Sequence, residues 1–201
     1  LLCNTGRPER DGFDVLEPKL AAIAARFGLE ALALPIRSVG VKADLRTYEH
    51  PVLLSGDVAW DALVEATARI SADVPGVNRC IWNLGPEVPS AAHPLAATTT
   101  RERLDVLREA DWLVMQGLRR HGLYHEIWQC PTVLVPLALD DDDGELVVLR
   151  PVQSRRAMTA QAVPLPEALL NELRRDILSL PGVGGLALDV TSKPPGTIEW
   201  E

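Results

Sequence analysis

The feature that most constrains this chain of 201 residues is a repeated order of short motifs in its two halves. Each half shows a predicted helix, two strands, a second helix, a Pro-Gly turn and a last strand. Three motifs recur in the same order, at separations of 94, 101 and 106 positions. They are Gly28-Leu29 with Gly122-Leu123, Leu34-Pro35-Ile36 with Val135-Pro136-Leu137, and Val74-Pro75-Gly76-Val77 with Leu180-Pro181-Gly182-Val183. This pattern indicates an internal duplication.

Hydrophobic periodicity defines the elements of the first half. Leu16, Leu20, Ile23 and Phe27 recur three and four apart, which is typical of an amphipathic helix, and Asp57 is a candidate cap for a second helix. Val39 to Leu45 has the composition of a loop. The predicted helices span 15–27 and 58–71, and the predicted strands span 30–37, 47–54 and 77–84.

The second half repeats this order after a stretch rich in Pro, Ala and Thr. Thr100 is a candidate N-cap for a long helix that ends at Gly122, and Pro166 begins the last helix. Asp140 to Gly144 has the composition of a hairpin turn. The remaining predicted elements are strands at 131–139, 145–152, 185–190 and 197–201, and a helix at 166–178.

These elements predict an α+β fold of two tandem two-layer α/β sandwiches. Each unit has the order α-β-β-α-β, an antiparallel sheet and helices on one face only. Since the free face of each sheet must be covered, the two units are expected to form an intrachain pseudo-dimer. The predicted domains are an irregular lead-in at 1–13, a first copy at 14–84, a linker at 85–100 and a second copy at 101–201.

Composition limits the classes of partner and compartment. A net charge of −8 argues against a nucleic-acid partner, because binding to phosphate backbones needs clustered Lys and Arg. The three cysteines lie far apart, which is typical of free thiols in the cytoplasm. No apolar run is long enough to cross a membrane, and no signal peptide opens the chain. The first residue is Leu, so we expect that residues upstream are missing.

No metal or cofactor site is predicted. His121 and His125 are four apart, but Gly122 is expected to end the helix between them. Asp140 to Asp143 lacks the spaced ligands of a calcium loop and is better interpreted as a solvated turn. No catalytic residue is assigned, because Ser55-Gly56-Asp57 has too few glycines for a phosphate loop and no nucleophile elbow occurs.

Both halves resemble the C-terminal dimerisation domain of GMP synthetase. The strongest match is the closing segment Lys193-Pro194-Pro195-Gly196-Thr197-Ile198-Glu199-Trp200-Glu201. Further matches in the second half are Arg101 to Asp111, Gly122-Leu123-Tyr124, Ile127-Trp128-Gln129 and Met158-Thr159-Ala160. Those in the first half are Pro35 to Val41, Asp44, Arg46-Thr47-Tyr48 and Val74 to Arg79.

Each half departs from the family pattern where the other keeps it. The Arg-Ser-Val-Gly-Val loop is present only at residues 37–41, and the Lys-Pro-Pro tail is present only at the chain end. The arginine eight positions before the tail lysine is Gly185 in the second half, whereas its counterpart in the first half is Arg79. A site with all family features would therefore need both halves to converge.

The resemblance implies a role in making GMP from XMP, ATP and glutamine. The chain has neither an ATP pyrophosphatase loop nor a glutaminase cysteine elbow, so it is not expected to be an enzyme alone. By resemblance, the nucleotide-binding residues are Arg79, Lys193, Ile198 and Glu199, and the partners are XMP or a related purine nucleotide and an ATP pyrophosphatase subunit. Lys193 would supply charge to a phosphate, and Glu199 would accept hydrogen bonds from purine N–H groups.

Structural interpretations of these residues remain open. Lys193 has the character of a solvated surface lysine, Glu199 of a charge that protects a sheet edge, and Arg79 of a partner for a neighbouring acid. Trp200 is interpreted as a packing anchor.

Three functions remain open for the whole chain. The first is a non-catalytic assembly or nucleotide-binding module. The second is the C-terminal portion of a functional GMP synthetase whose catalytic parts lie elsewhere. The third is an RNA-binding KH module, for which Gly182-Val183-Gly184-Gly185 is a poor clamp.

Overall fold

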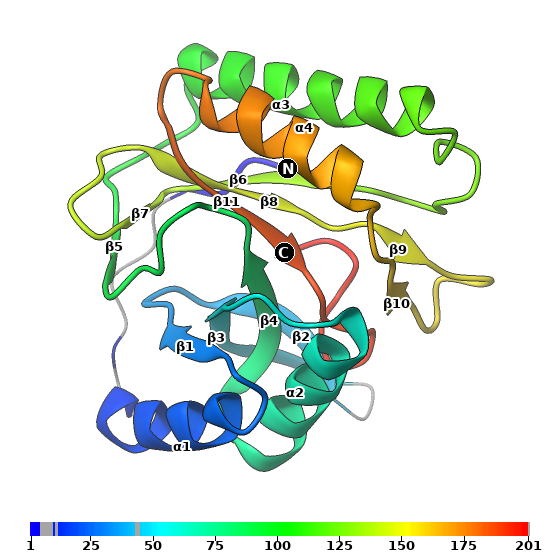
Figure 1. Cartoon of the computed structure of the whole chain (residues 1–201). Coiled ribbons are helices and arrows are strands. Elements are labelled where there is room, and N and C mark those ends of the chain that lie inside the picture. The colour runs from blue at the N-terminus through cyan, green and yellow to red at the C-terminus, as the bar shows by residue number, and fades with distance from the viewer. Residues whose placement is uncertain (5–9, 11, 43–44, 201) are drawn as a thin grey trace.

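A computed structural model describes residues 1–4, 10, 12–42 and 45–200. The main sheet has seven strands in the order β1-β3-β4-β11-β8-β6, with β2 added on β3. Figure 1 shows α3 and α4 above the strands of the second half and α1 and α2 below those of the first half. The strands of both halves therefore lie between two pairs of helices, and the mixed α/β class predicted from the sequence is confirmed.

The helices agree with the predicted periodicity. Thr100 caps α3 as expected, since its side chain accepts a hydrogen bond from the Arg103 N–H at 3.3 Å. The predicted cap at Asp57 is wrong, because α2 begins three residues later and its N-cap, Ala59, makes no side-chain bond. The four helices are α1 (Phe13–Ala25), α2 (Trp60–Asp73), α3 (Arg101–Arg120) and α4 (Glu167–Leu178). No described helix is both long and apolar enough to cross a bilayer.

Strands of the first half follow the predicted order with two additions, β2 and β5. The segment Val39 to Leu45 was expected to be a loop, but most of it forms β2, which pairs with the first part of a long β3. Proline 51 does not interrupt β3. The strands are β1 (Glu30–Ala33), β2 (Ser38–Lys42), β3 (Leu45–Ser55), β4 (Val77–Asn83) and β5 (Ala92–Pro94).

The second half contains the predicted hairpin, since β6 and β8 pair in antiparallel fashion. The predicted final strand at 197–201 is not a regular strand in its described part, 197–200. The strands are β6 (Thr132–Val135), β7 (Leu137–Leu139), β8 (Glu145–Leu149), β9 (Val152–Gln153), β10 (Gln161–Ala162) and β11 (Val183–Asp189).

The prediction that each sheet is antiparallel is wrong in part. The inner pairs β3–β4 and β8–β11 are parallel, whereas β1–β3 and β6–β8 are antiparallel. The reason is the intervening helix: α2 and α4 each carry the chain back to the end of the sheet from which it came, and such a crossover gives parallel strands.

The two halves join through the antiparallel pair β4–β11, and its register is symmetric. Leu188 pairs with Trp82, 106 positions away, which is the separation of the Pro-Gly motifs. The same separation of 106 positions relates Asn83 to Asp189 and Ile81 to Ala187. It therefore converts the flanking pair Ala187–Asn83 into the other flanking pair, Asp189–Ile81. A pseudo-twofold axis through Leu188 and Trp82 would produce this register. The duplication stays a hypothesis, and this symmetry is what it predicts.

Side chains alternate along the inner strands and supply two cores. Val52, Leu54, Leu186 and Leu188 belong to the core beneath the helices. Leu53, Ile81, Val148 and Ala187 point the other way into a second core shared by both halves. Residues of both halves therefore contribute to this second core, and the intrachain pseudo-dimer itself stays a prediction.

The predicted linker is partly structured. Residues 92–94 form β5, which pairs with β7, and Leu95 N–H donates to Pro136 O at 3.0 Å. The segment that follows β4 of the first half therefore pairs with β7 of the second half. The proposed domain boundaries themselves stay predictions.

Replacing Leu188 with Ala should lower the free energy of unfolding by about 2–5 kcal/mol, because it opens a cavity at a fully buried position in the central strand pair. Urea unfolding of both proteins measures the difference. The matched control is Leu45→Ala, at a residue that is 72% exposed, where we expect a change within about 0.5 kcal/mol. Equal effects of the two substitutions would contradict the central role of this strand pair.

Candidate functional site

The C-terminal tail, residues 193–200, lies against β2 of the other half. Val41 N–H donates to Pro195 O at 2.8 Å, Thr197 N–H donates to Val39 O at 3.4 Å, and Gly40 bridges Gly196. The family-like loop kept by the first half and the family-like tail kept by the second half are therefore in direct contact. This is the convergence that the sequence required for one complete site.

Glycine at position 40 permits this contact. A Cβ there would lie 2.7 Å from Pro195 O and 2.9 Å from the Asn78 Cβ. Both distances are shorter than real Cβ atoms tolerate, so any side chain would force the tail and β2 apart. The glycine of the Arg-Ser-Val-Gly-Val loop thus has a packing reason that the sequence alone did not reveal.

A buried ionic cluster lies behind the tail. Asp189, the last residue of β11, accepts from Arg79 Nη1 at 2.5 Å and from Arg150 Nη1 at 2.7 Å. All three side chains are 0% exposed. Arg79 comes from β4, and Arg150 follows β8, so one carboxylate joins three neighbouring strands. Burial of charge is tolerated only with such partners.

Electrostatics within the cluster follow from burial and charge. Burial favours the neutral form of Asp189, but the charges of Arg150 and Arg79 outweigh this effect and hold its pKa below the ordinary value. Burial lowers the pKa of Arg150 to about 10, although Asp189 opposes this shift. The cluster contains two guanidinium groups and one carboxylate, so its formal charge is one excess positive charge.

Arg79 joins this cluster to the tail. Its Nη2 donates to Thr197 Oγ1 and to Val39 O, both at 3.1 Å, and makes a longer contact with Glu199 O at 3.4 Å. Its guanidinium also lies 4.8 Å from the ring centroid of Trp200. The interpretation of Arg79 as the partner of an acid agrees with these contacts. Its predicted role as a nucleotide ligand stays a prediction, and this guanidinium presents no exposed surface.

Trp200 secures the end of the tail. Its ring is 5% exposed and belongs to the core shared by both halves, while its indole N–H donates to Asp189 Oδ2 at 3.0 Å. These contacts agree with a packing anchor. The tail is therefore held at both the Pro195 and Trp200 ends.

The other predicted site residues lie along the same tail. The Lys193 ammonium donates to Ala157 O at 2.8 Å, and none of the ion pairs in the described part of the chain involves it. Ile198 is buried against Val152 and Ala160, so only its backbone is available to a ligand. The side chain of Glu199 is exposed. Lys193 and Glu199 thus present polar side chains beside a fixed backbone.

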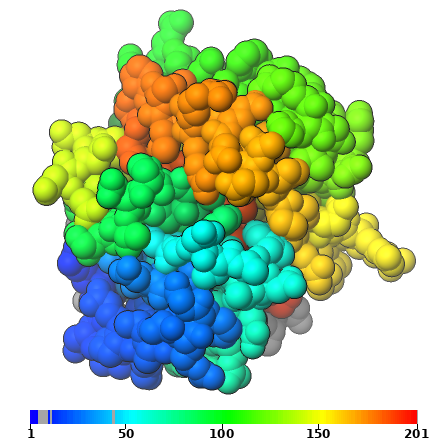
Figure 2. All heavy atoms as spheres, viewed as in Figure 1, coloured from blue at the N-terminus to red at the C-terminus, as the bar shows by residue number. Residues whose placement is uncertain are grey.

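A cavity of about 500 Å³ borders the tail on the side of α2. Its walls are mostly apolar, and among the described residues that line it Lys42 is the charged one. In Figure 2 the tail, in red, reaches the surface only in small areas between the cyan α2 and the yellow and orange segments of the second half. The lining residues include Val64 and Ala68 of α2, and Ser192, Pro194 and Pro195 of the tail.

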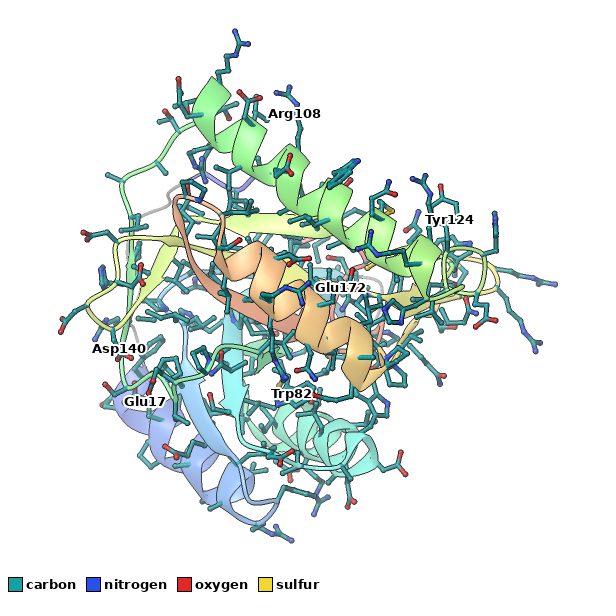
Figure 3. All side chains as sticks on the ribbon, turned by 45° about the horizontal axis from the view of Figure 1, so that its top comes forward. Glu17, Trp82, Arg108, Tyr124, Asp140 and Glu172 are labelled. Carbon is teal, nitrogen blue, oxygen red and sulfur yellow. The ribbon has the colours of Figure 1, made fainter. Side chains whose placement is uncertain are left out.

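The described residues provide no metal centre. No group of three or more His, Cys, Asp or Glu side chains among them is arranged to hold an ion. His121 instead contacts the Glu172 carboxylate at 3.2 Å, on the side of α4 that faces α3 (Figure 3). Asp140 accepts hydrogen bonds from the Ser90 and Ala91 N–H groups at 2.9 and 3.0 Å, which makes it a turn residue.

Sequence reasoning missed Asp189, Arg150 and Gly40. Asp189 had a usable signal, because an acid ending an otherwise apolar strand needs a buried cation. Arg150 had the same signal at the end of β8. Gly40 was recognised only as part of a motif. The residues around it in the sequence do not indicate that its backbone lies against Gly196, which is 156 positions away.

Comparisons with known proteins agree with the resemblance. Residues 116–200 match the family model described as GMP synthase C terminal domain. The chain is 35% identical over 190 residues to a probable GMP synthase [glutamine-hydrolyzing] of Leptospira interrogans, covering 89% of this chain and 30% of that protein. It is 46% identical over 177 residues to the GMP synthase [glutamine-hydrolyzing] of Leifsonia xyli, covering 79% and 35%.

The similarity extends beyond the second half. A match over 89% of the chain must include most of the first half, which lies outside the family model's 116–200. The chain spans about a third of the length of these relatives. These matches confirm the relation inferred from the tail and from the loop at residues 37–41.

Replacing Asp189 with Ala should destabilise the fold by about 3–5 kcal/mol, because two buried guanidinium groups lose the carboxylate that pairs with both of them. Thermal or urea unfolding measures this loss. The control is Asp105→Ala, which removes an exposed carboxylate paired with Arg108 and should change stability little. A loss no larger than that of the control would show that the buried cluster does not hold the strands and tail together.

Proposed function

Because the chain is related to GMP synthase through its C-terminal domain, we propose that it is a non-catalytic assembly region with one purine-nucleotide site built by both halves. Its role belongs to GMP biosynthesis. The observation that carries the proposal is the contact between the tail of the second half and β2 of the first half. Each half lacks one family feature, and this contact reunites them.

The tail supplies the groups that would recognise the nucleotide. Lys193 carries a compact charge for the phosphate, Glu199 accepts hydrogen bonds from purine N–H groups, and Ile198 offers its backbone. The buried Arg79 does not contact the nucleotide in this proposal. It holds the tail backbone in place by donating hydrogen bonds to the carbonyl groups of Thr197 and Glu199. A backbone fixed in this way loses little entropy on binding.

The duplication hypothesis explains why one chain contains both parts. Two copies of an ancestral domain would form a pseudo-dimer through β4 and β11, each sending its closing segment onto the other. In this proposal the first copy's closing segment became residues 85–100 and lost the Lys-Pro-Pro motif, so only one of two sites remains. Three cysteines far apart in the sequence and an acidic net charge are consistent with a cytoplasmic protein without a nucleic-acid partner.

We expect selective binding of XMP, with GMP and AMP as comparison ligands, in calorimetric titrations of the purified chain. Lys193→Ala should weaken XMP binding about tenfold or more, because a charge-assisted contact to the phosphate is lost. Lys19→Ala, at an exposed lysine of α1, is the matched control and should bind XMP like the original protein.

Gly40→Ala tests the composite nature of the site. The added methyl group collides with Pro195 O and should separate the tail from β2, which reduces XMP affinity while the core strands stay folded. Circular dichroism checks the fold. Full XMP affinity in Gly40→Ala would show that the tail works without the first half, and no XMP binding at millimolar ligand in the original protein would overturn the nucleotide site.

A second candidate function is the C-terminal portion of a functional glutamine-hydrolysing GMP synthetase. Its support is that the chain spans about a third of the relatives that it matches. The ATP pyrophosphatase and glutaminase would then lie on the same or another polypeptide. Adding this chain to a GMP synthase truncated before its C-terminal domain tests the idea: restored GMP formation from XMP favours this candidate, and no restoration favours the non-catalytic module.

A further inference from the structure

The loop between β9 and β10, residues 154–160, carries two arginines beside the tail. Arg155 and Arg156 are both exposed. Among the described residues, neither guanidinium forms an ion pair or a hydrogen bond. The chain has a net charge of −8, and these two adjacent cations belong to the same loop whose Ala157 carbonyl accepts a hydrogen bond from a third cation, Lys193.

The tail fixes the position of this loop. Lys193 N–H donates to Ala160 O at 2.7 Å, and Ala160 N–H donates to Lys193 O at 3.1 Å. The Lys193 ammonium reaches Ala157 O at 2.8 Å. Ala157 directly follows Arg156, so the backbone of the arginine pair lies within two residues of the carbonyl that Lys193 binds.

Contacts within the loop order it as well. Ser154 Oγ accepts from Ala157 N–H at 2.9 Å and donates to Thr159 O at 2.6 Å. Ala157 adopts a left-handed conformation, with φ of 58°, which non-glycine residues rarely do. Figure 1 shows the loop projecting from the edge of the molecule beyond β9 and β10.

We propose that Arg155 and Arg156 form an arm that binds the phosphate group of the ligand held by the tail. The inference rests on the proposed nucleotide site and adds residues to it that the tail motif does not contain. Lys193 uses one of its three N–H donors on Ala157 O and keeps two for an anion. A planar guanidinium binds a phosphate through two parallel hydrogen bonds, which a lysine cannot do. A phosphate monoester dianion is therefore the ligand chemistry that matches Lys193 together with two arginines in the loop that Lys193 contacts.

Two sources of this chemistry are distinguishable. A nucleotide monophosphate brings its own phosphate, whereas inorganic pyrophosphate would bind without a base. Calorimetric titrations with XMP, xanthosine and pyrophosphate therefore separate recognition of the phosphate from recognition of the base.

The variant that tests the arm is Arg155→Ala/Arg156→Ala. It should weaken XMP binding about tenfold to a hundredfold, which is the usual size of one charge-assisted hydrogen bond, and leave any binding of xanthosine unchanged. Arg155→Lys/Arg156→Lys should restore part of the affinity, because it returns charge without the planar fork. Arg101→Ala, at a side chain that is 87% exposed on α3, is the control for loss of an arginine and should have no effect.

Each outcome decides between the two proposals. If the original chain binds XMP and the double alanine variant binds it equally well, the arm is wrong and the nucleotide site stands. If pyrophosphate binds, XMP binds no better, and the variant loses pyrophosphate, then the arm is an anion site and the nucleotide proposal fails. If the original chain binds neither XMP nor pyrophosphate, both proposals are overturned.

Discussion

The carboxylate of Asp189 is the interaction on which the rest of the structure depends. It accepts from Arg79 of the first half, from Arg150 of the second half and from the indole of Trp200 in the tail. A buried ion pair adds little stability compared with well-packed apolar residues, but loss of one partner leaves an unpaired charge in the interior. What the cluster does in the structure is join β4, the end of β8, β11 and the tail at one carboxylate.

This arrangement also brings the family-like loop of the first half against the family-like tail of the second half. The loop that contains Gly40 meets the tail that contains Lys193 because the two halves share one core and the tail crosses the junction between them. The reciprocal crossing, in which β5 pairs with β7, has no Lys-Pro-Pro motif and ends at the acidic turn of Asp140. The contact between the tail and β2 has cationic side chains beside it, whereas the contact between β5 and β7 has the carboxylate of Asp140 beside it. An anionic ligand would therefore favour the first contact over the second.

Local patterns in the sequence were sufficient for most of the elements. The cap at Thr100, the periodicity of α3 and α4 and the Pro-Gly turns all act over a few residues, and the structure agrees with them. The errors arise where distant segments decide the local structure. Residues 38–42 have a weak strand pattern and become β2 because β3 on one side and the tail on the other satisfy their backbone groups. The parallel inner pairs also depend on how the helices connect the strands, which the periodicity of apolar residues does not encode.

In the candidate site, the tail residues were recognisable as a motif, whereas Arg150 and Asp189 acquire their role only when β8, β11 and β4 are adjacent.

The charge balance behind the tail also bears on ligand type. Two guanidinium groups and one carboxylate leave an excess positive charge with no exposed surface, and the Nε and Nη2 of Arg150 have no hydrogen-bond partner among the described residues. The field of this charge reaches the tail, since Glu199 favours the protonated form of Arg150 and so raises its pKa against the larger effect of burial. An interaction through a poorly hydrated interior is screened less than one across the solvent. The buried excess charge lies behind Thr197 and Glu199, whereas the Lys193 ammonium lies at the start of the tail, against the loop that contains Arg155 and Arg156. In the proposed site, a purine mononucleotide would place its phosphate at Lys193 and its N–H donors toward the Glu199 carboxylate, which is the order in which these two residues follow along the tail.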